Sequence, residues 1–199
     1  MALWEKRASK PKGTILLLHG KTWSALPDFD LQVTGENLSF MDGLVEKGYT
    51  VYALDGRGYG GTPRDHTGWL TPDRAAQDAT AILTWIKSRN GIASHLFGWS
   101  YGSMVAQLVV QRLPDLVSSV TLFGYPYYRG RFASTERPEY PAVAPAKENT
   151  AHNAASDFIT PGSISDEAIA AYVAAALSAD PVRVDFKDLH QWQALDPTR

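Results

Sequence analysis

Residues 94–110 have the sequence SHLFGWSYGSMVAQLVV, which contains the clearest structural signal in the chain. An apolar segment of strand length comes first, the turn 98–102 follows, and Val105 and Leu108 then recur at helical spacing. This order of strand, sharp turn and helix is the context in which the pattern Gly-x-Ser-x-Gly presents a serine hydroxyl to solvent. We therefore interpret Ser100 as a candidate nucleophile.

The two glycines of this turn have a steric role. Because they lack Cβ atoms, Gly98 and Gly102 let the strand and the helix pass close together while Ser100 occupies a strained turn. The alternative is a small-residue turn that only permits close packing and gives Ser100 no chemical role. The flanking strand and helix favour the nucleophile.

The composition is that of an ordinary globular protein without a strong charge. The chain has 199 residues, of which 44% are hydrophobic and 20% charged, and its net charge is −2. This balance gives no reason to expect a nucleic acid or an anionic membrane as a partner. Cysteine is absent, which excludes disulfides, a thiol nucleophile and cysteine-ligated zinc. The sequence implies no metal ion.

No apolar segment approaches the roughly 20 residues that a transmembrane helix needs. The longest candidate, residues 168–177, is rich in alanine and is interrupted by Tyr172. The amino-terminal segment is basic and lacks the apolar core of a signal peptide. A cytoplasmic location without membrane association is therefore the expectation.

Apolar segments of strand length alternate with helical patterns in the first part of the chain. The expected strands are residues 14–18, 50–54, the start of 94–110, and 117–123, and the expected helices are 36–47, 71–90 and the remainder of 94–110 to Leu113. Strands and helices that alternate at this spacing form right-handed βαβ units. We therefore expect an α/β fold with a mostly parallel sheet flanked by helices.

The pattern changes after residue 124. A proline-rich stretch at 137–145 leads to polar segments and to a helix for which Ser165 is the expected N-cap. We expect residues 1–124 to form an α/β core and residues 125–199 to form a helical cap over the ends of the strands.

A second candidate element is the loop that follows residues 14–18. It begins with His19-Gly20, and such loops at the carboxyl end of a parallel strand point backbone N–H groups into a crevice. The backbone N–H of Lys21, or of Thr22, is the expected first oxyanion donor, and the N–H of Tyr101 the second. For the side chain of His19 we favour a role within the loop.

The stretch GRGYGG at residues 56–61 satisfies the spacing of a dinucleotide-binding motif. Its context does not fit, because Thr62-Pro63 follows it instead of a helix, and no acidic residue ends a strand at the expected distance. We therefore expect no nucleotide cofactor, and we interpret Asp55 and Arg57 as residues that hold the turn through local contacts.

Three motifs together make the chain resemble the α/β-hydrolase superfamily, in its lid-bearing serine esterase branch. They are His19-Gly20, the sequence DGRGYG at residues 55–60, and GWSYG at residues 98–102, in that order. The resemblance implies a serine hydrolase of carboxylic esters that needs no cofactor. It also implies that a histidine activates the serine and that an acid orients the histidine, in the chain order Ser, Asp or Glu, His.

In complete members of this superfamily two further strands follow the cap and carry the acid and the histidine. This chain ends at residues 195–199, where the first of them would begin, so we expect an incomplete hydrolase core. Only His152 and His190 follow Ser100, and each has carboxylates nearby in the sequence. Either is a tentative replacement base. The alternative is that both are surface or packing histidines.

Aromatic residues near the strand ends limit the class of substrate that we expect. Trp23, Trp99 and Tyr125 form the expected substrate pocket, with Tyr127 and Tyr128 close in sequence, which favours an apolar or aromatic acyl group. The alternative is that they form core between sheet and cap. Peptidase, thioesterase, lactonase and carbon–carbon hydrolase activities remain open, as does a non-catalytic binding module that lacks the acid and the histidine.

The strand at residues 117–123 would form an apolar edge of an incomplete sheet. Because such edges pair with other chains, we expect a homo-oligomer or an exchange of elements between subunits.

Overall fold

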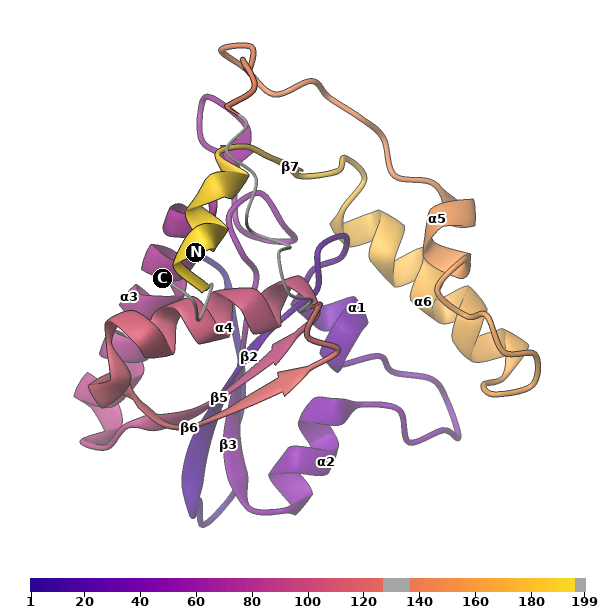
Figure 1. Cartoon of the computed structure of the whole chain (residues 1–199). Helices are drawn as coiled ribbons and strands as arrows, with labels where there is room; N and C mark the ends of the chain where they lie inside the picture. Colours follow the sequence, from indigo (N-terminus) through magenta and orange to yellow (C-terminus); the bar gives the residue numbers. More distant parts are fainter. Residues whose placement is uncertain (127–136, 196–199) are drawn as a thin grey trace.

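The computed structural model describes residues 1–126 and 137–195. Its centre is a five-stranded sheet in the order β1-β3-β2-β5-β6, in which β1 is antiparallel to β3 and the other pairs are parallel (Figure 1). The strands are β1 (Leu3–Lys6), β2 (Gly13–Leu18), β3 (Tyr49–Leu54), β5 (Ser94–Trp99) and β6 (Val117–Phe123). The predicted α/β fold with a mostly parallel sheet is confirmed.

Strand β2 is the middle strand, and all six of its residues are buried. Its side chains alternate between the two faces of the sheet, so that Leu16 and Leu18 enter one apolar cluster while Ile15 and Leu17 enter another. A parallel strand covered on both faces has a continuous apolar sequence, which explains why β2 could be predicted without polar alternation.

Helices cover both faces of the sheet (Figure 1). α3 (Pro72–Asn90) and α4 (Tyr101–Arg112) pack on one face, and α1 (Ala25–Phe29) and α2 (Phe40–Glu46) on the other. α3 starts as predicted, because Thr71 Oγ1 accepts a hydrogen bond from the Arg74 N–H at 3.2 Å. α2 starts later than residue 36, because Ser39 is its N-cap.

Two helices form a separate layer beside α1 (Figure 1). They are α5 (Ala151–Ala155) and α6 (Asp166–Ala179). Ser165 caps α6, as predicted, by accepting a hydrogen bond from the Ala168 N–H at 3.0 Å. The layer is joined to the rest of the chain by an apolar cluster that contains Trp23 together with Tyr172 and Ala176 of α6.

The chain after α6 returns to the main core. β7 (Asp185–Phe186) pairs in parallel with β4 (Trp69–Leu70), and η2 (Leu189–Leu195) buries Trp192 and Leu195 in the cluster that α3 and α4 form on the sheet. Residues 125–199 therefore contribute to both layers, and the division of the chain at residue 124 stays a prediction.

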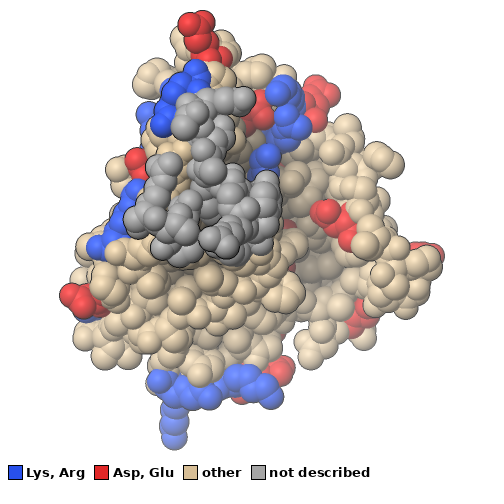
Figure 2. Space-filling view, viewed as in Figure 1, with Lys and Arg blue, Asp and Glu red and all other residues tan. Residues whose placement is uncertain are grey.

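Strand β6 forms one edge of the five-stranded sheet and is entered from the 3₁₀ turn η1 (Pro114–Leu116). Val120, Leu122 and Phe123 of β6 are 38%, 36% and 61% exposed. The surface over β6 and α4 is largely uncharged in Figure 2. Within the described ranges, no helix combines the length and hydrophobicity needed to cross a membrane.

Candidate active site

Ser100 lies on a sharp turn between β5 and α4. Its φ of 51° and ψ of −114° fall outside the regions that residues with a side chain normally occupy. Two backbone hydrogen bonds hold the turn: the Ser100 N–H donates to the Phe123 carbonyl at 2.8 Å, and the Ser103 N–H donates to the Ser100 carbonyl at 3.0 Å. The backbone strain is therefore located at the predicted nucleophile itself.

The glycines on either side of Ser100 are required by close backbone contacts. A Cβ atom at Gly98 would lie 2.6 Å from Ser103 Cα, and one at Gly102 would lie 2.6 Å from the His19 carbonyl oxygen. Real Cβ atoms do not approach backbone this closely. The turn therefore brings the start of α4 directly against the end of β2, where the second predicted element begins.

That second element is the His19–Ser24 loop, and acids hold it at both ends. The Gly20 N–H donates to Asp28 Oδ2 at 3.2 Å. The Ser24 N–H donates to Asp180 Oδ2 at 2.8 Å. Both amides are thus used by side chains of the protein, and neither is free to bind a ligand.

The N–H groups in the middle of the loop are different. Lys21, Thr22 and Trp23 have backbone N–H groups without a hydrogen-bond partner among residues 1–126 and 137–195, and so does Tyr101 at the first turn of α4. The carbonyl of Lys21 accepts a hydrogen bond from the Tyr59 hydroxyl, which fixes the orientation of its peptide. The predicted donors at Lys21, or Thr22, and Tyr101 are therefore unpaired within the described part of the chain.

His19 braces the loop through both ring nitrogens. Nδ1 lies 2.8 Å from the Gly20 carbonyl oxygen, and Nε2 accepts a hydrogen bond from the Gly56 N–H at 3.0 Å. This pair of contacts places the proton on Nδ1 of a neutral ring. Burial lowers the pKa of His19, which favours the same neutral form. The side chain occupies the loop-bracing position expected from the sequence.

The glycine-rich turn that follows β3 uses its own amides. The N–H groups of Gly58, Gly60 and Gly61 donate to the Thr62 carbonyl, to Asp180 Oδ1 and to Asp55 Oδ2, respectively. A phosphate group would find none of these three donors free. The contacts agree with a structural role for the turn.

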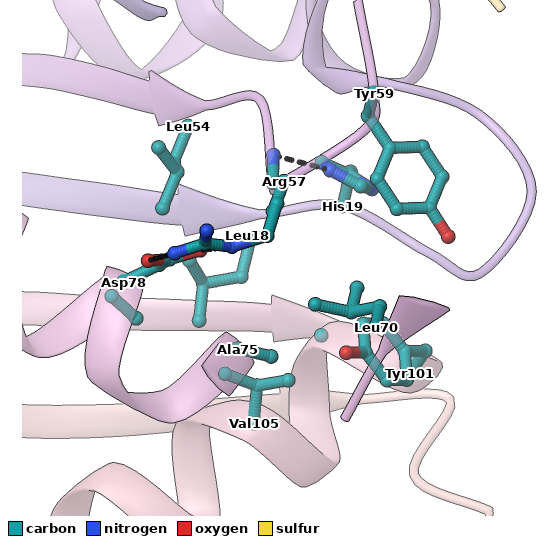
Figure 3. A pocket seen from close by; sticks show the side chains of 13 residues that line it. Leu18, His19, Leu54, Arg57, Tyr59, Leu70, Ala75, Asp78, Tyr101 and Val105 are labelled. Atoms are coloured by element: carbon teal, nitrogen blue, oxygen red, sulfur yellow. Dashed lines mark hydrogen bonds and ion pairs between the residues drawn. The ribbon is translucent and has the colours of Figure 1, made fainter. Parts of the chain in front are cut away.

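A cavity of about 30 Å³ lies beside the start of α4 (Figure 3). Leu18, Tyr59, Tyr101 and Val105 contribute to its wall, together with the ion pair between Arg57 and Asp78. This volume has room for about one or two water molecules. Tyr101 Oη is buried and has no hydrogen-bond partner in the described part of the chain, and burial raises the pKa of this phenol.

The aromatic residues predicted to line a substrate pocket lie in different clusters. Trp23 is buried between its loop and α6, Trp99 packs against the α1 side of the sheet, and Tyr125 packs against the α3 and α4 side. Tyr127 and Tyr128 lie outside the described residues. The structure does not gather Trp23, Trp99 and Tyr125 into one pocket, so their role in binding stays a prediction.

Among the described residues, neither histidine proposed as a base makes a hydrogen bond to the Ser100 side chain. His152 is exposed on α5, and His190 is half-buried on η2. The Ser100 hydroxyl makes no hydrogen bond within residues 1–126 and 137–195. η2 nevertheless lies next to the start of α4, because Trp192 packs edge-on against Tyr101 with their ring centroids 5.7 Å apart.

Sequence reasoning missed Asp28 and Asp180, the two acids that hold the His19–Ser24 loop. Asp28 lies on the short helix α1, and Asp180 is the C-cap of α6, far away in the sequence. No local pattern distinguishes them from surface acids. Their positions become clear only when α6 is placed against the loop.

Comparison with models of protein families identifies the family to which this chain belongs. Residues 15–199 match the model of the alpha/beta hydrolase family. The match covers most of the chain, so this protein belongs to that family, and the resemblance inferred from the three motifs is confirmed. A search of curated proteins found no match.

Solved structures with a similar fold include hydrolases of more than one kind. An epoxide hydrolase from Vigna radiata is 21% identical with a TM-score of 0.51, over 64% of this chain and 35% of that one. A structure described with carboxylesterases from Nitrososphaera gargenis is 17% identical to this chain with a TM-score of 0.50. The similarity covers 61% of this chain and 40% of that one. An esterase from Exiguobacterium antarcticum is 22% identical with a TM-score of 0.48, over 60% and 39%.

The chain spans less than half the length of each of these structural neighbours. At these identities the likeness concerns the fold alone. The reaction and the substrate must therefore be argued from the residues of this chain.

Proposed function

We propose that this chain carries the nucleophile and the oxyanion donors of a serine hydrolase that acts on carboxylic esters. The observation that supports it most directly is a strained serine on a turn that lies against the start of the His19–Ser24 loop. In this proposal Ser100 provides the hydroxyl, and the donors are the N–H groups of Tyr101 and of Lys21 or Thr22, which have no partner in the described part of the chain.

The proposed reaction has two steps. Ser100 Oγ attacks the ester carbonyl carbon and gives its proton to a base, while the carbonyl oxygen becomes an oxyanion that accepts hydrogen bonds from the N–H groups of Lys21 and Tyr101. The tetrahedral intermediate then expels the alkoxide, which takes up the proton, and leaves an acyl group on Oγ. Water attacks this acyl-enzyme in the second step, and the carboxylic acid and the free serine are released.

For the base we propose His190 or His152. His190 is the better of the two candidates in this chain, because Trp192 of the same 3₁₀ segment packs against Tyr101. His152 would need a larger movement from its exposed position on α5. A histidine supplied by another chain would serve the same role.

For the substrate we propose an apolar or aromatic acyl group. Trp99 supports it, because its ring lies 3.6 Å from the position that a Cβ atom at Gly20 would occupy, and Gly20 belongs to the loop that carries the proposed donors. Large apolar rings next to an oxyanion site favour acyl chains over charged groups.

A second candidate function is a binding module without catalysis. The observation that favours it is the unpartnered hydroxyl of Ser100 in the described part of the chain. A serine without a base keeps some oxyanion stabilisation and substrate binding but loses several orders of magnitude in rate.

Hydrolysis of short-chain p-nitrophenyl esters tests the two candidates. We expect turnover by the natural chain, loss of turnover in Ser100→Ala, and no change in the control Ser88→Ala, which removes an exposed hydroxyl from α3. Variants His190→Ala and His152→Ala identify the base. Equal inertness of the natural chain and Ser100→Ala, together with no labelling by an activated phosphonate, would favour the binding module.

We also propose that the chain associates with itself along β6. The support is the exposed apolar edge formed by Val120, Leu122 and Phe123.

A further inference from the structure

Helix α6 is fixed to the rest of the protein at three points along its length. At its start, Ser165 Oγ donates to Glu36 Oε1 at 2.5 Å. In its middle, the Tyr172 hydroxyl donates to Asp28 Oδ1 at 3.1 Å. At its end, the side chain of Asp180 accepts from two backbone N–H groups.

Two of these three points lead directly to the His19–Ser24 loop. Asp28 holds Tyr172 with one carboxylate oxygen and the Gly20 N–H with the other. Asp180 accepts from the Ser24 N–H and from the Gly60 N–H, each at 2.8 Å. The two ends of the loop are therefore held by carboxylates that either belong to α6 or are bonded to it.

Packing adds to these hydrogen bonds. Trp23, inside the loop, is 2% exposed and shares an apolar cluster with Tyr172 and Ala176 of α6. If α6 moves away, the loop loses the Asp180 contact at Ser24 and the packing around Trp23, while Asp28 loses its contact with Tyr172.

We infer that α6 positions the oxyanion donors, with Tyr172 and Asp180 as the positioning residues. The inference rests on the proposed function, because it assigns a purpose to the unpaired N–H groups of Lys21 and Thr22. Neither side chain touches the substrate. Tyr172 acts through Asp28 and Gly20, and Asp180 acts through Ser24, so α6 fixes the two ends of the loop whose middle peptide Tyr59 orients.

Tyr172→Phe removes one hydrogen bond and keeps the ring in its cluster. A matched control is Glu36→Ala, which removes the hydrogen bond at the start of α6 without touching the loop. We expect amide hydrogen exchange at Gly20 to become roughly fivefold faster in Tyr172→Phe, the equivalent of one neutral hydrogen bond, and to stay unchanged in Glu36→Ala. Amides within α6 report any general loss of the cap in either variant.

A second measurement uses the chemistry. In Tyr172→Phe we expect the first-order rate constant for phosphonate labelling of Ser100 to fall about tenfold while the apparent affinity stays the same, because donors are displaced and binding surface is not. Asp28→Asn, which keeps an acceptor for the Gly20 N–H, should label more like the natural chain than Asp28→Ala does.

The two measurements separate the possible failures. If the natural chain is not labelled at all, the proposed function fails. Amide hydrogen exchange at Gly20 still decides whether α6 positions the His19–Ser24 loop. If Gly20 exchanges equally fast in Tyr172→Phe, in Glu36→Ala and in the natural chain, α6 only covers the loop and the inference is overturned.

Discussion

The backbone N–H of Ser100 donates a hydrogen bond of 2.8 Å to the carbonyl of Phe123, the last residue of β6. The proposed nucleophile is therefore tied to the edge strand of the sheet. Phe123 is itself 61% exposed, although its ring stacks against Phe97 at a centroid distance of 6.2 Å. A single backbone hydrogen bond thus connects this edge of the sheet to the candidate active site.

The first prediction concerns Gly102. Its replacement by alanine places a Cβ atom 2.6 Å from the His19 carbonyl oxygen, and neither backbone segment can move without disturbing the sheet. We expect Gly102→Ala to lower the free energy of unfolding by roughly 2 to 3 kcal/mol in urea denaturation. Gly43→Ala is the control, because no atom lies within 4 Å of a Cβ atom built there. A stability loss of equal size in both variants would contradict the steric explanation.

The second prediction isolates the strain at Ser100. Glycine tolerates the φ of 51° that serine and alanine do not. We expect Ser100→Gly to be more stable than Ser100→Ala by about 1 kcal/mol, although both lose the hydroxyl. Thermal denaturation of the two variants checks this, and equal melting temperatures would show that the turn stores no strain.

The third prediction concerns Asp55, which is 1% exposed. Its carboxylate accepts hydrogen bonds from the Ala25 N–H, the Gly61 N–H and the Trp4 indole. Asp55→Ala leaves these donors unpaired, so we expect a loss of about 3 to 5 kcal/mol in the free energy of unfolding.

Asp73→Ala provides the comparison, since it removes an exposed acid paired with Arg112. We expect a loss below about 1 kcal/mol there. Similar losses for Asp55→Ala and Asp73→Ala would show that burial does not decide the difference.

The fourth prediction is a pH dependence from Asp28. Burial raises the pKa of its carboxyl group well above the ordinary value, against the hydrogen bonds from Gly20 and Tyr172, and the charges of Asp180 and Asp157 act in the same direction as burial. The folded chain therefore binds this proton more tightly than the unfolded chain does. The contribution of Asp28 to stability is full below the ordinary Asp pKa of about 3.9 and is lost as the pH rises through the folded pKa.

Asp28→Asn cannot ionise. We expect the free energy of unfolding of Asp28→Asn, relative to that of the natural chain, to increase as the pH rises above about 4 in urea titrations, because only the natural chain loses the contribution of the protonated carboxyl group. A constant difference between the two proteins across this range would show that Asp28 does not titrate with a raised pKa.

The fifth prediction concerns the edge strand. A lysine on an exposed strand edge opposes pairing with another chain, so Leu122→Lys should reduce self-association measured by sedimentation at micromolar concentration. The comparison variant is Ser118→Lys, because Ser118 is exposed on β6 but is not apolar. A natural chain that sediments only as a monomer would contradict the association itself.

The elements that could be predicted from the sequence are those whose signal is local. Residues 14–18 form a continuous apolar run because β2 is buried on both faces, and Thr71-Pro72 marks the start of α3 through the chemistry of a helix cap. The turn around Ser100 belongs to this group, because its glycines are required by backbone contacts between neighbouring elements.

The parts that could not be predicted depend on contacts between distant residues. Nothing near Asp28 or Asp180 in the sequence indicates that both hold the His19–Ser24 loop, since α6 reaches that loop from more than a hundred residues away. Likewise, the return of η2 to the main core was not expected from a segment that follows a cap.

The sequence by itself determined the class of fold, the position of Ser100 on its turn and the membership in the family, because periodicity, capping and steric need are short-range properties. Only the tertiary structure decided which amides near Ser100 stay unpaired in the described part of the chain, because side chains from other elements bind the Gly20 and Ser24 amides and the Lys21 carbonyl of the His19–Ser24 loop. A free N–H is a property of everything packed around it, and no single stretch of sequence contains that information.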